Sequence, residues 1–114
     1  MSLRAIVALA VALVPTLALS AEPRSGAAVY AERCAPCHGD GGAGDGPAAA
    51  ALEPRPRNFR DASFWNGRTA DQLRIVVRDG KPGTMMSPFK DVLSAAEIDA
   101  VVAYVGSFRP AAHP

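Results

Sequence analysis

The stretch Cys34-Ala35-Pro36-Cys37-His38 decides the fold of this chain. Its spacing, C-x-x-C-H, is typical of a site where haem is attached covalently. Two thiols three positions apart on one helical turn can each form a thioether with a haem vinyl group, and the imidazole of His38 can then bind the iron. Cys34 and Cys37 are also the only two cysteines among the 114 residues. The motif therefore predicts one haem c, bound through Cys34 and Cys37 and ligated by His38.

The segment before this motif is typical of an export signal. One positive charge, at Arg4, precedes an uncharged apolar run over residues 5–19, and small residues then permit cleavage after Ser20 or Ala21. We therefore expect a periplasmic protein. An uncleaved membrane anchor is the alternative, although the apolar run is short for a bilayer span and contains Pro15.

The predicted organisation is a signal peptide over 1–20, a folded domain over 21–110 and a disordered tail over 111–114. The chain has 12 basic and 11 acidic side chains, and Arg4 is the only charged residue of the signal, so the mature domain would be neutral. Nothing in this balance points to nucleic-acid binding. Only 6% of the residues are aromatic. Small domains with few large side chains usually need additional stabilisation, such as a disulfide or a bound metal. A buried haem would supply the missing core, so we expect the apoprotein to be largely unfolded.

Three helices are predicted from capping residues and apolar spacing, over 25–34, 69–79 and 94–107. Ser25 is the expected N-cap of the first, and the other two begin with capping boxes, Thr69 with Gln72 and Ser94 with Glu97. The glycine-rich segment 39–60 reads as irregular, with room for one short helical turn over 48–52. No alternating strand pattern is present. The fold class is all-α, with short helices and long loops.

The second iron ligand should come from a distant part of the chain. Met85 and Met86 lie on a loop that glycine and proline punctuate, between the second and third helices. A thioether is a soft, neutral ligand, and His/Met ligation raises the reduction potential. His113 is a poorer candidate because it lies in the Pro/Ala-rich tail. The residues alone leave Met85 and Met86 both open.

The chain resembles a class I cytochrome c of the bacterial periplasmic mono-haem type over essentially the whole mature sequence. The likeness rests on a helix that runs into C-x-x-C-H, on Gly46-Pro47 after it, and on a G-x-M-type loop before the last helix. It implies a cytochrome c-like fold wrapped around one haem. In related bacterial proteins the loop often reads Gly-Thr-x-Met-Pro, which selects Met86 over Met85, although Ser87 stands where proline is usual.

The resemblance also implies roles around the haem. The carbonyl of Pro47 would accept a hydrogen bond from Nδ1 of His38. The segment 55–60 is similar to the Pro-Arg-(Asn/Asp)-Phe segment of many periplasmic members, and either Arg57 or Trp65 would bind a propionate.

Other residues of the resemblance concern the fold or the surface. Gly26, Tyr30 and Tyr104 match the small and aromatic residues where the two terminal helices cross. We expect Arg55 and Arg60 to lie on the solvated surface.

The predicted function is one-electron transfer and not enzymatic turnover, because a haem with two protein ligands has no open position for a substrate. The resemblance implies a monomer that shuttles electrons between a donor dehydrogenase or bc1-type complex and an acceptor oxidase or reductase. It would meet the membrane only through these partners or through an uncleaved anchor.

Four other functions are alternatives to a free electron carrier. The chain would be a haem-bearing subunit of a larger dehydrogenase or oxidase complex, or a ligand-binding sensor if the Met86 ligand is labile. A thioredoxin-like dithiol would need βαβ units that the sequence lacks. A zinc site on Cys34, Cys37, His38 and His113 would lack the usual second pair of ligands.

Overall fold

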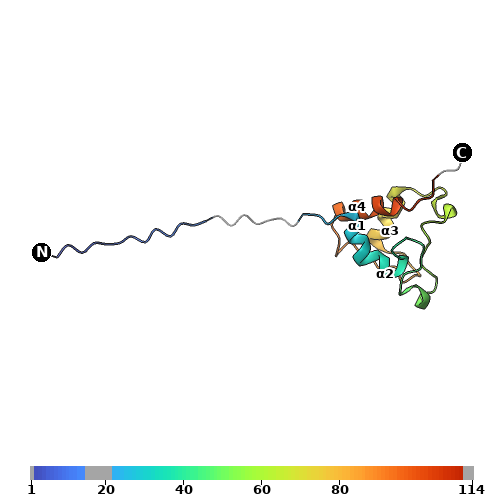
Figure 1. Ribbon diagram of the computed structural model, residues 1–114, viewed down its shortest axis with the longest axis horizontal. Coiled ribbons are helices and arrows are strands. Elements are labelled where there is room, and N and C mark those ends of the chain that lie inside the picture. The colour runs from blue at the N-terminus through green and yellow to red at the C-terminus, as the bar shows by residue number, and fades with distance from the viewer. Residues whose placement is uncertain (1, 15–21, 112–114) are drawn as a thin grey trace.

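The computed structural model describes residues 2–14 and 22–111. Within these residues it contains helices and no strands, as the sequence predicts (Figure 1). Residues 2–14 are extended and expose their apolar side chains. The predicted cleavage sites at Ser20 and Ala21, and His113 in the tail, lie outside the described residues. No helix in the described part of the chain is long and apolar enough to cross a bilayer.

The first helical segment runs from residue 26 to 38 and contains the whole C-x-x-C-H motif. It is built from α1 (Gly26–Val29), a π-helical turn (Tyr30–Cys34) and α2 (Ala35–His38). Oγ of Ser25 accepts a hydrogen bond from the backbone N–H of Ala28 (3.1 Å), which confirms the predicted N-cap. The segment continues one turn beyond the predicted end because Pro36 stands in the first turn of α2, where its missing N–H costs nothing.

The other two predicted helices are confirmed with their capping boxes. They are α3 (Ala70–Asp79) and α4 (Ala95–Gly106). In each, the N-cap hydroxyl accepts from the N3 backbone while the N3 side chain accepts from the N-cap backbone. Gly80 ends α3 at a φ of 75°, a conformation that glycine adopts without strain.

Two short 3₁₀ turns lie in the long connection between α2 and α3. One, at Ala49–Ala51, is the short helical turn that the sequence predicts. The other, at Ala62–Trp65, is not predicted. Its N-cap is Asp61, whose Oδ1 accepts a hydrogen bond from the backbone N–H of Ser63 (3.0 Å). The four residues of the turn are too few to show a helical spacing of apolar side chains, so the Asp61 cap is the only local indication of this turn in the sequence.

The core lies where the N-terminal helical segment crosses α4 (Figure 1). Val29 and Val101 are fully buried there, and the rings of Tyr30 and Tyr104 lie 5.1 Å apart. A Cβ on Gly26 would lie 2.1 Å from the backbone oxygen of Ala100, so glycine is what lets the two backbones meet. The predicted crossing of the terminal helices is confirmed.

Candidate functional site

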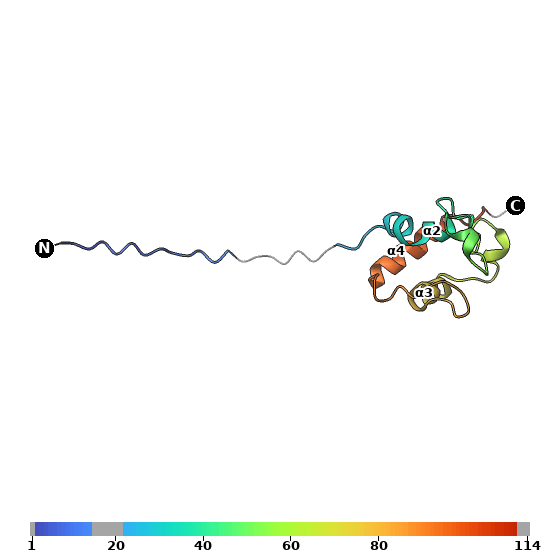
Figure 2. The same cartoon turned by 90° about the horizontal axis from the view of Figure 1, so that it is seen from below.

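An open cavity of about 470 Å³ lies beside the C-x-x-C-H motif. Figure 2 shows α3 in a different layer from α2 and α4, and residues from all three helices line the cavity. Its walls are largely apolar, with side chains that include Leu52, Phe64, Leu73, Val76, Val77, Val102 and Val105. The apolar face of α3 has no fully buried residue because it faces this cavity. A volume and lining of this kind suit a large apolar ligand.

Cys34 and Cys37 both line the cavity, and both are free thiols. Burial raises the pKa of the Cys34 thiol to about 11, with a smaller contribution from nearby Cys37. Both side chains are half-buried and stand on the helical segment that forms this wall. The structure thus presents the two predicted attachment thiols to one apolar space.

His38 lines the same cavity, and its ring stacks on Phe59 with centroids 4.4 Å apart. Its Nδ1 lies 3.2 Å from the backbone oxygen of Arg57. Burial lowers the pKa of His38, although the hydrogen bond to Arg57 opposes this shift. Burial therefore favours the neutral imidazole. With the proton on Nδ1, the lone pair of Nε2 is free for a metal.

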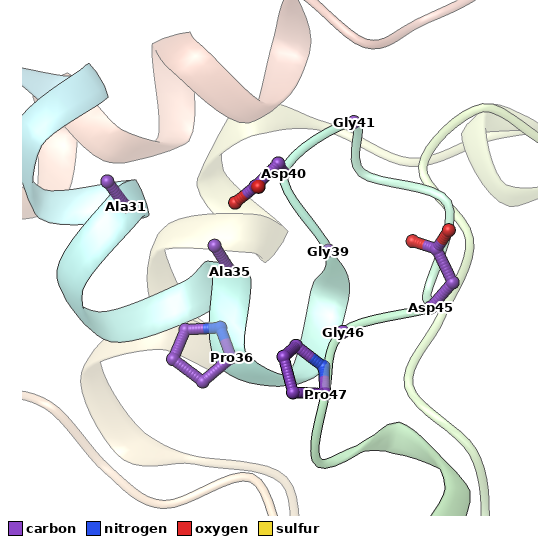
Figure 3. Close-up of a pocket in the computed structure, with 9 residues that line it drawn as sticks. All are labelled: Ala31, Ala35, Pro36, Gly39, Asp40, Gly41, Asp45, Gly46 and Pro47. Atoms are coloured by element: carbon purple, nitrogen blue, oxygen red, sulfur yellow. The ribbon is translucent and has the colours of Figure 1, made fainter.

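The acceptor for His38 is thus Arg57, and the prediction that Pro47 fills this role is wrong. Pro47 lies on the outer side of α2, where it lines a second pocket together with Pro36, Asp40 and Asp45 (Figure 3). The loop takes this course because its backbone N–H groups bond the last carbonyls of the helix: Gly44 to His38, Gly46 to Cys37 and Ala48 to Pro36 (2.8, 3.1 and 2.9 Å). These bonds satisfy groups that a helix end leaves without partners.

Trp65 is the second departure from the expected site. Its indole N–H donates to the backbone oxygen of Phe59 (2.7 Å), and its ring is buried away from the cavity. The structure therefore gives no support to the predicted propionate contact of Trp65, since its N–H donor is used within the chain and the residue does not line the cavity. Arg57, the other candidate, does line the cavity.

The two arginines expected on the surface are both exposed. Arg55 nevertheless contributes to the lining of the cavity. Arg60 does not, because its guanidinium bonds the carbonyl of Gly41 and lies over the ring of Phe108.

The methionine loop closes another side of the cavity, and both methionines line it. Met85 is 71% exposed, whereas Met86 is half-buried. The backbone of Met86 is fixed on both sides: its N–H donates to Oγ1 of Thr84 (3.1 Å), and its carbonyl accepts from Lys81 (3.2 Å). A Cβ at Gly80 would lie 2.8 Å from that carbonyl. Met86 is thus better positioned than Met85 to present its thioether to a metal in the cavity.

Three further residues of the site were not predicted from the sequence: Phe59, Phe64 and Arg68. All three line the cavity, and the aromatic pair is buried. Phe59 lies two residues after Arg57, in the segment 55–60 that the sequence already connects with the haem, so its position in that segment could have indicated its role. A lone arginine before a helix, such as Arg68, carries no comparable sequence signal.

The residues around the cavity fit a haem. Two free thiols, an imidazole with a fixed Nδ1 and a half-buried thioether face one apolar space. The charged side chains that line it are all cationic, and no Asp or Glu among the described residues does so. The cations are Arg33, Arg55, Arg57, Arg68 and Lys81. Such a set would complement the two propionates of a haem.

Comparison with known proteins agrees with this geometry. Residues 21–105 match the protein family described as cytochrome C oxidase, cbb3-type, subunit III. The chain belongs to this family of c-type cytochrome domains. The cytochrome c-like fold expected from the sequence is thereby confirmed.

Relatives of this cytochrome domain include parts of larger proteins. The cbb3-type cytochrome c oxidase subunit FixP of Azorhizobium caulinodans is 32% identical over 101 residues, which cover 82% of this chain and 32% of FixP. This chain thus spans about a third of the length of that curated relative.

Two solved structures share the fold at a TM-score of 0.65. The Kuenenia stuttgartiensis reducing HAO-like protein complex is 31% identical, over 77% of this chain and 43% of that one. The KustC0563 c-type cytochrome is 28% identical, over 76% of this cytochrome domain and all of its own chain.

Proposed function

We propose that this cytochrome domain carries single electrons through one haem c. The haem would be bound covalently to Cys34 and Cys37, with its iron ligated by His38 and Met86. The observation that carries the proposal is that both free thiols, the oriented imidazole and the half-buried thioether line one apolar cavity. The alternative readings as a dithiol enzyme or a zinc site give no reason for that cavity.

When bound, the haem supplies reversible Fe(III)/Fe(II) chemistry. The chain's own residues would set the conditions for it. The carbonyl of Arg57 holds the His38 ring and its tautomer. The valines of α3 and α4 that line the cavity would shield a bound haem from water. Met86 favours the reduced state because its thioether is neutral and soft. If His38 and Met86 both bind the iron, no coordination position would remain for a substrate.

The partners would be redox proteins of the periplasm, a donor dehydrogenase or bc1-type complex and an acceptor oxidase or reductase. The apolar residues 5–14, which are exposed, and the small residues around position 20 support export by a cleavable signal. An uncleaved anchor would instead keep the domain at the membrane.

A second candidate is that the domain serves as a haem-bearing subunit of a larger redox complex. FixP is an oxidase subunit, and the Kuenenia stuttgartiensis structure is a complex. Purification of the native protein distinguishes the two roles. A free carrier elutes as a monomer of this chain, whereas a subunit co-purifies in fixed stoichiometry with other chains.

Periplasmic expression together with a haem-maturation system tests the proposal. We expect haem that resists acid-acetone extraction, a pyridine haemochrome spectrum typical of two thioether links, and a reversible one-electron redox titration. Replacement of Cys37 by Ala should shift that spectrum to the single-thioether form. Extractable haem in the unmodified protein would refute the covalent site. Rapid binding of CO at neutral pH would favour the sensor, because it requires Met86 to leave.

A further inference from the structure

Among the cations that line the cavity, Arg68 differs from the others in its burial. Arg33, Arg55, Arg57 and Lys81 are exposed, whereas Arg68 is half-buried. Within the described residues Arg68 makes no ion pair. A charge removed from water without a counter-charge is costly. The position of Arg68 is therefore one that an anion inside the cavity would stabilise.

The ring of Phe64 fixes the position of this guanidinium. Cζ of Arg68 lies 4.2 Å from the centroid of Phe64, and its Nε donates to the backbone oxygen of the same residue (2.7 Å). Cζ of Arg57 lies 5.1 Å from the same centroid. The ring thus holds two guanidinium groups, which the chain supplies from either side of the 3₁₀ turn Ala62–Trp65.

The hydrogen bond to the backbone uses only Nε of Arg68, and the described part of the chain offers no hydrogen-bond acceptor to its terminal amino groups. Arginine binds carboxylates through such N–H groups, often two at a time. No carboxylate of the described residues lines the cavity. An anion at this position would therefore come from the ligand.

We propose that Arg68 binds a haem propionate and that Phe64 positions it, together with Arg57, for this contact. The inference rests on the proposed function, because it requires the haem. It assigns to Arg68 a role that the sequence does not reveal, since the candidates from the sequence were Arg57 and Trp65.

The test compares the pH dependence of the reduction potential in four proteins: the unmodified holoprotein, Arg68→Gln, Arg68→Lys and the control Arg109→Gln. Arg109 also lies over an aromatic ring, that of Trp65, at 5.8 Å, but it does not line the cavity. Its replacement removes the same charge without touching the proposed contact.

A cation beside a carboxylate lowers the pKa of that carboxylate by about one to three units. Loss of Arg68 should therefore move the propionate titration, seen as the sloping part of the potential–pH curve, upward by about one unit or more. Arg68→Lys should give an intermediate shift, because the positive charge remains while the bidentate hydrogen bonding of the guanidinium is lost. Arg109→Gln should leave the curve in place. Far-UV circular dichroism and the haemochrome spectrum establish that each variant is folded and loaded.

Two results would overturn the inference. One is a curve for Arg68→Gln that matches that of the unmodified protein. The other is an equal shift in Arg109→Gln, which would indicate a general effect of charge. If Arg68→Gln fails to fold, Arg68→Lys decides: an intermediate upward shift supports the inference, and an unshifted curve overturns it. Absence of covalent haem from the unmodified protein would refute the proposed function itself and this inference with it.

Discussion

The backbone oxygen of Arg57 lies 3.2 Å from Nδ1 of His38, while the guanidinium of the same residue lies over the Phe64 ring at the cavity. One residue thus orients the proposed iron ligand through its main chain and reaches the cavity through its side chain. The position of the 56–57 backbone is set by Gly44, where a Cβ would lie 2.7 Å from the oxygen of Pro56 and 3.2 Å from that of Arg57.

Substitution of Gly44 by Ala should therefore disturb His38 as well as the fold. Gly44 has a φ of 76°, so alanine would suffer both backbone strain and the contact with residues 56–57. Gly67→Ala is the matched control, since Gly67 has a φ of 67° and open space around its Cβ position. Strain alone costs about 1–2 kcal/mol, and the contact should add about 1–3 kcal/mol in Gly44→Ala. Denaturant unfolding of both holoproteins measures this, and only Gly44→Ala should also shift the reduction potential. Equal effects in the two variants would mean that the 56–57 contact has no influence.

Replacement of Met86 and Met85 by Ala should give opposite results. Loss of Met86 should abolish the weak red absorption band of methionine-ligated ferric haem and lower the reduction potential, because the soft neutral ligand is gone. Loss of Met85, which is 71% exposed, should leave both unchanged. Absorption spectra and redox titrations of the two holoproteins decide the ligand. If the band disappears in Met85→Ala and persists in Met86→Ala, the assignment is reversed.

The crossing of the N-terminal segment and α4 should not tolerate a methyl group on Gly26. An added Cβ would lie 2.1 Å from the oxygen of Ala100 and 3.1 Å from Cβ of Tyr104, so Gly26→Ala should destabilise the holoprotein by about 1–3 kcal/mol. Gly106→Ala is the control within α4, where the Cβ meets nothing within 4 Å. It should be neutral or stabilising by up to about 1 kcal/mol. Thermal melts of both variants measure the difference, and similar melting temperatures would contradict the close approach.

Much of this fold could be predicted because its signals are local. Ser25, Thr69 and Ser94 each cap a helix through hydrogen bonds to residues three positions away. The C-x-x-C-H motif likewise places two thiols and an imidazole within five consecutive residues. The apolar stripe of α4 was also visible from its spacing, since Val101, Val102 and Val105 are buried.

The features that the sequence did not reveal depend on contacts between distant segments. The acceptor of His38 is 19 residues away, and it was Arg57 and not Pro47 because the N–H groups of the glycine-rich loop bond the end of α2. Trp65 could donate either to a propionate or to a carbonyl, and only the path of the chain decides in favour of Phe59. The role of Arg68 depends on the placement of Phe64 in the cavity wall.

Removal of the haem should unfold most of the domain. The apolar residues of α3 and part of α4 face a cavity of about 470 Å³, and α3 buries none of its side chains fully. The double variant Cys34→Ser/Cys37→Ser, which cannot form the thioethers, should therefore lose most of its helical far-UV circular dichroism once free haem is removed. Met85→Ala passed through the same purification is the control. A native-like spectrum with cooperative melting in the haem-free protein would refute the expectation.

The stability of the domain in acid should depend on Glu97, a buried carboxylate at the start of α4. One oxygen accepts from the backbone N–H of Ser94 (3.0 Å) and the other from Nε of Arg24 (2.8 Å), and these bonds lower the pKa of Glu97 to about 2. Because the folded-state pKa is depressed, the stabilisation is complete above the ordinary value of 4.5 and is lost as the pH falls toward 2. Unfolding free energies should therefore show the unmodified holoprotein more stable than Glu97→Gln above that pH, with a gap that closes between about pH 4.5 and pH 2. Glu32→Gln is the control because Glu32 also pairs with Arg24 but is exposed, so its loss should change little at any pH. A gap that stays constant across this range would show that the charge of Glu97 contributes nothing.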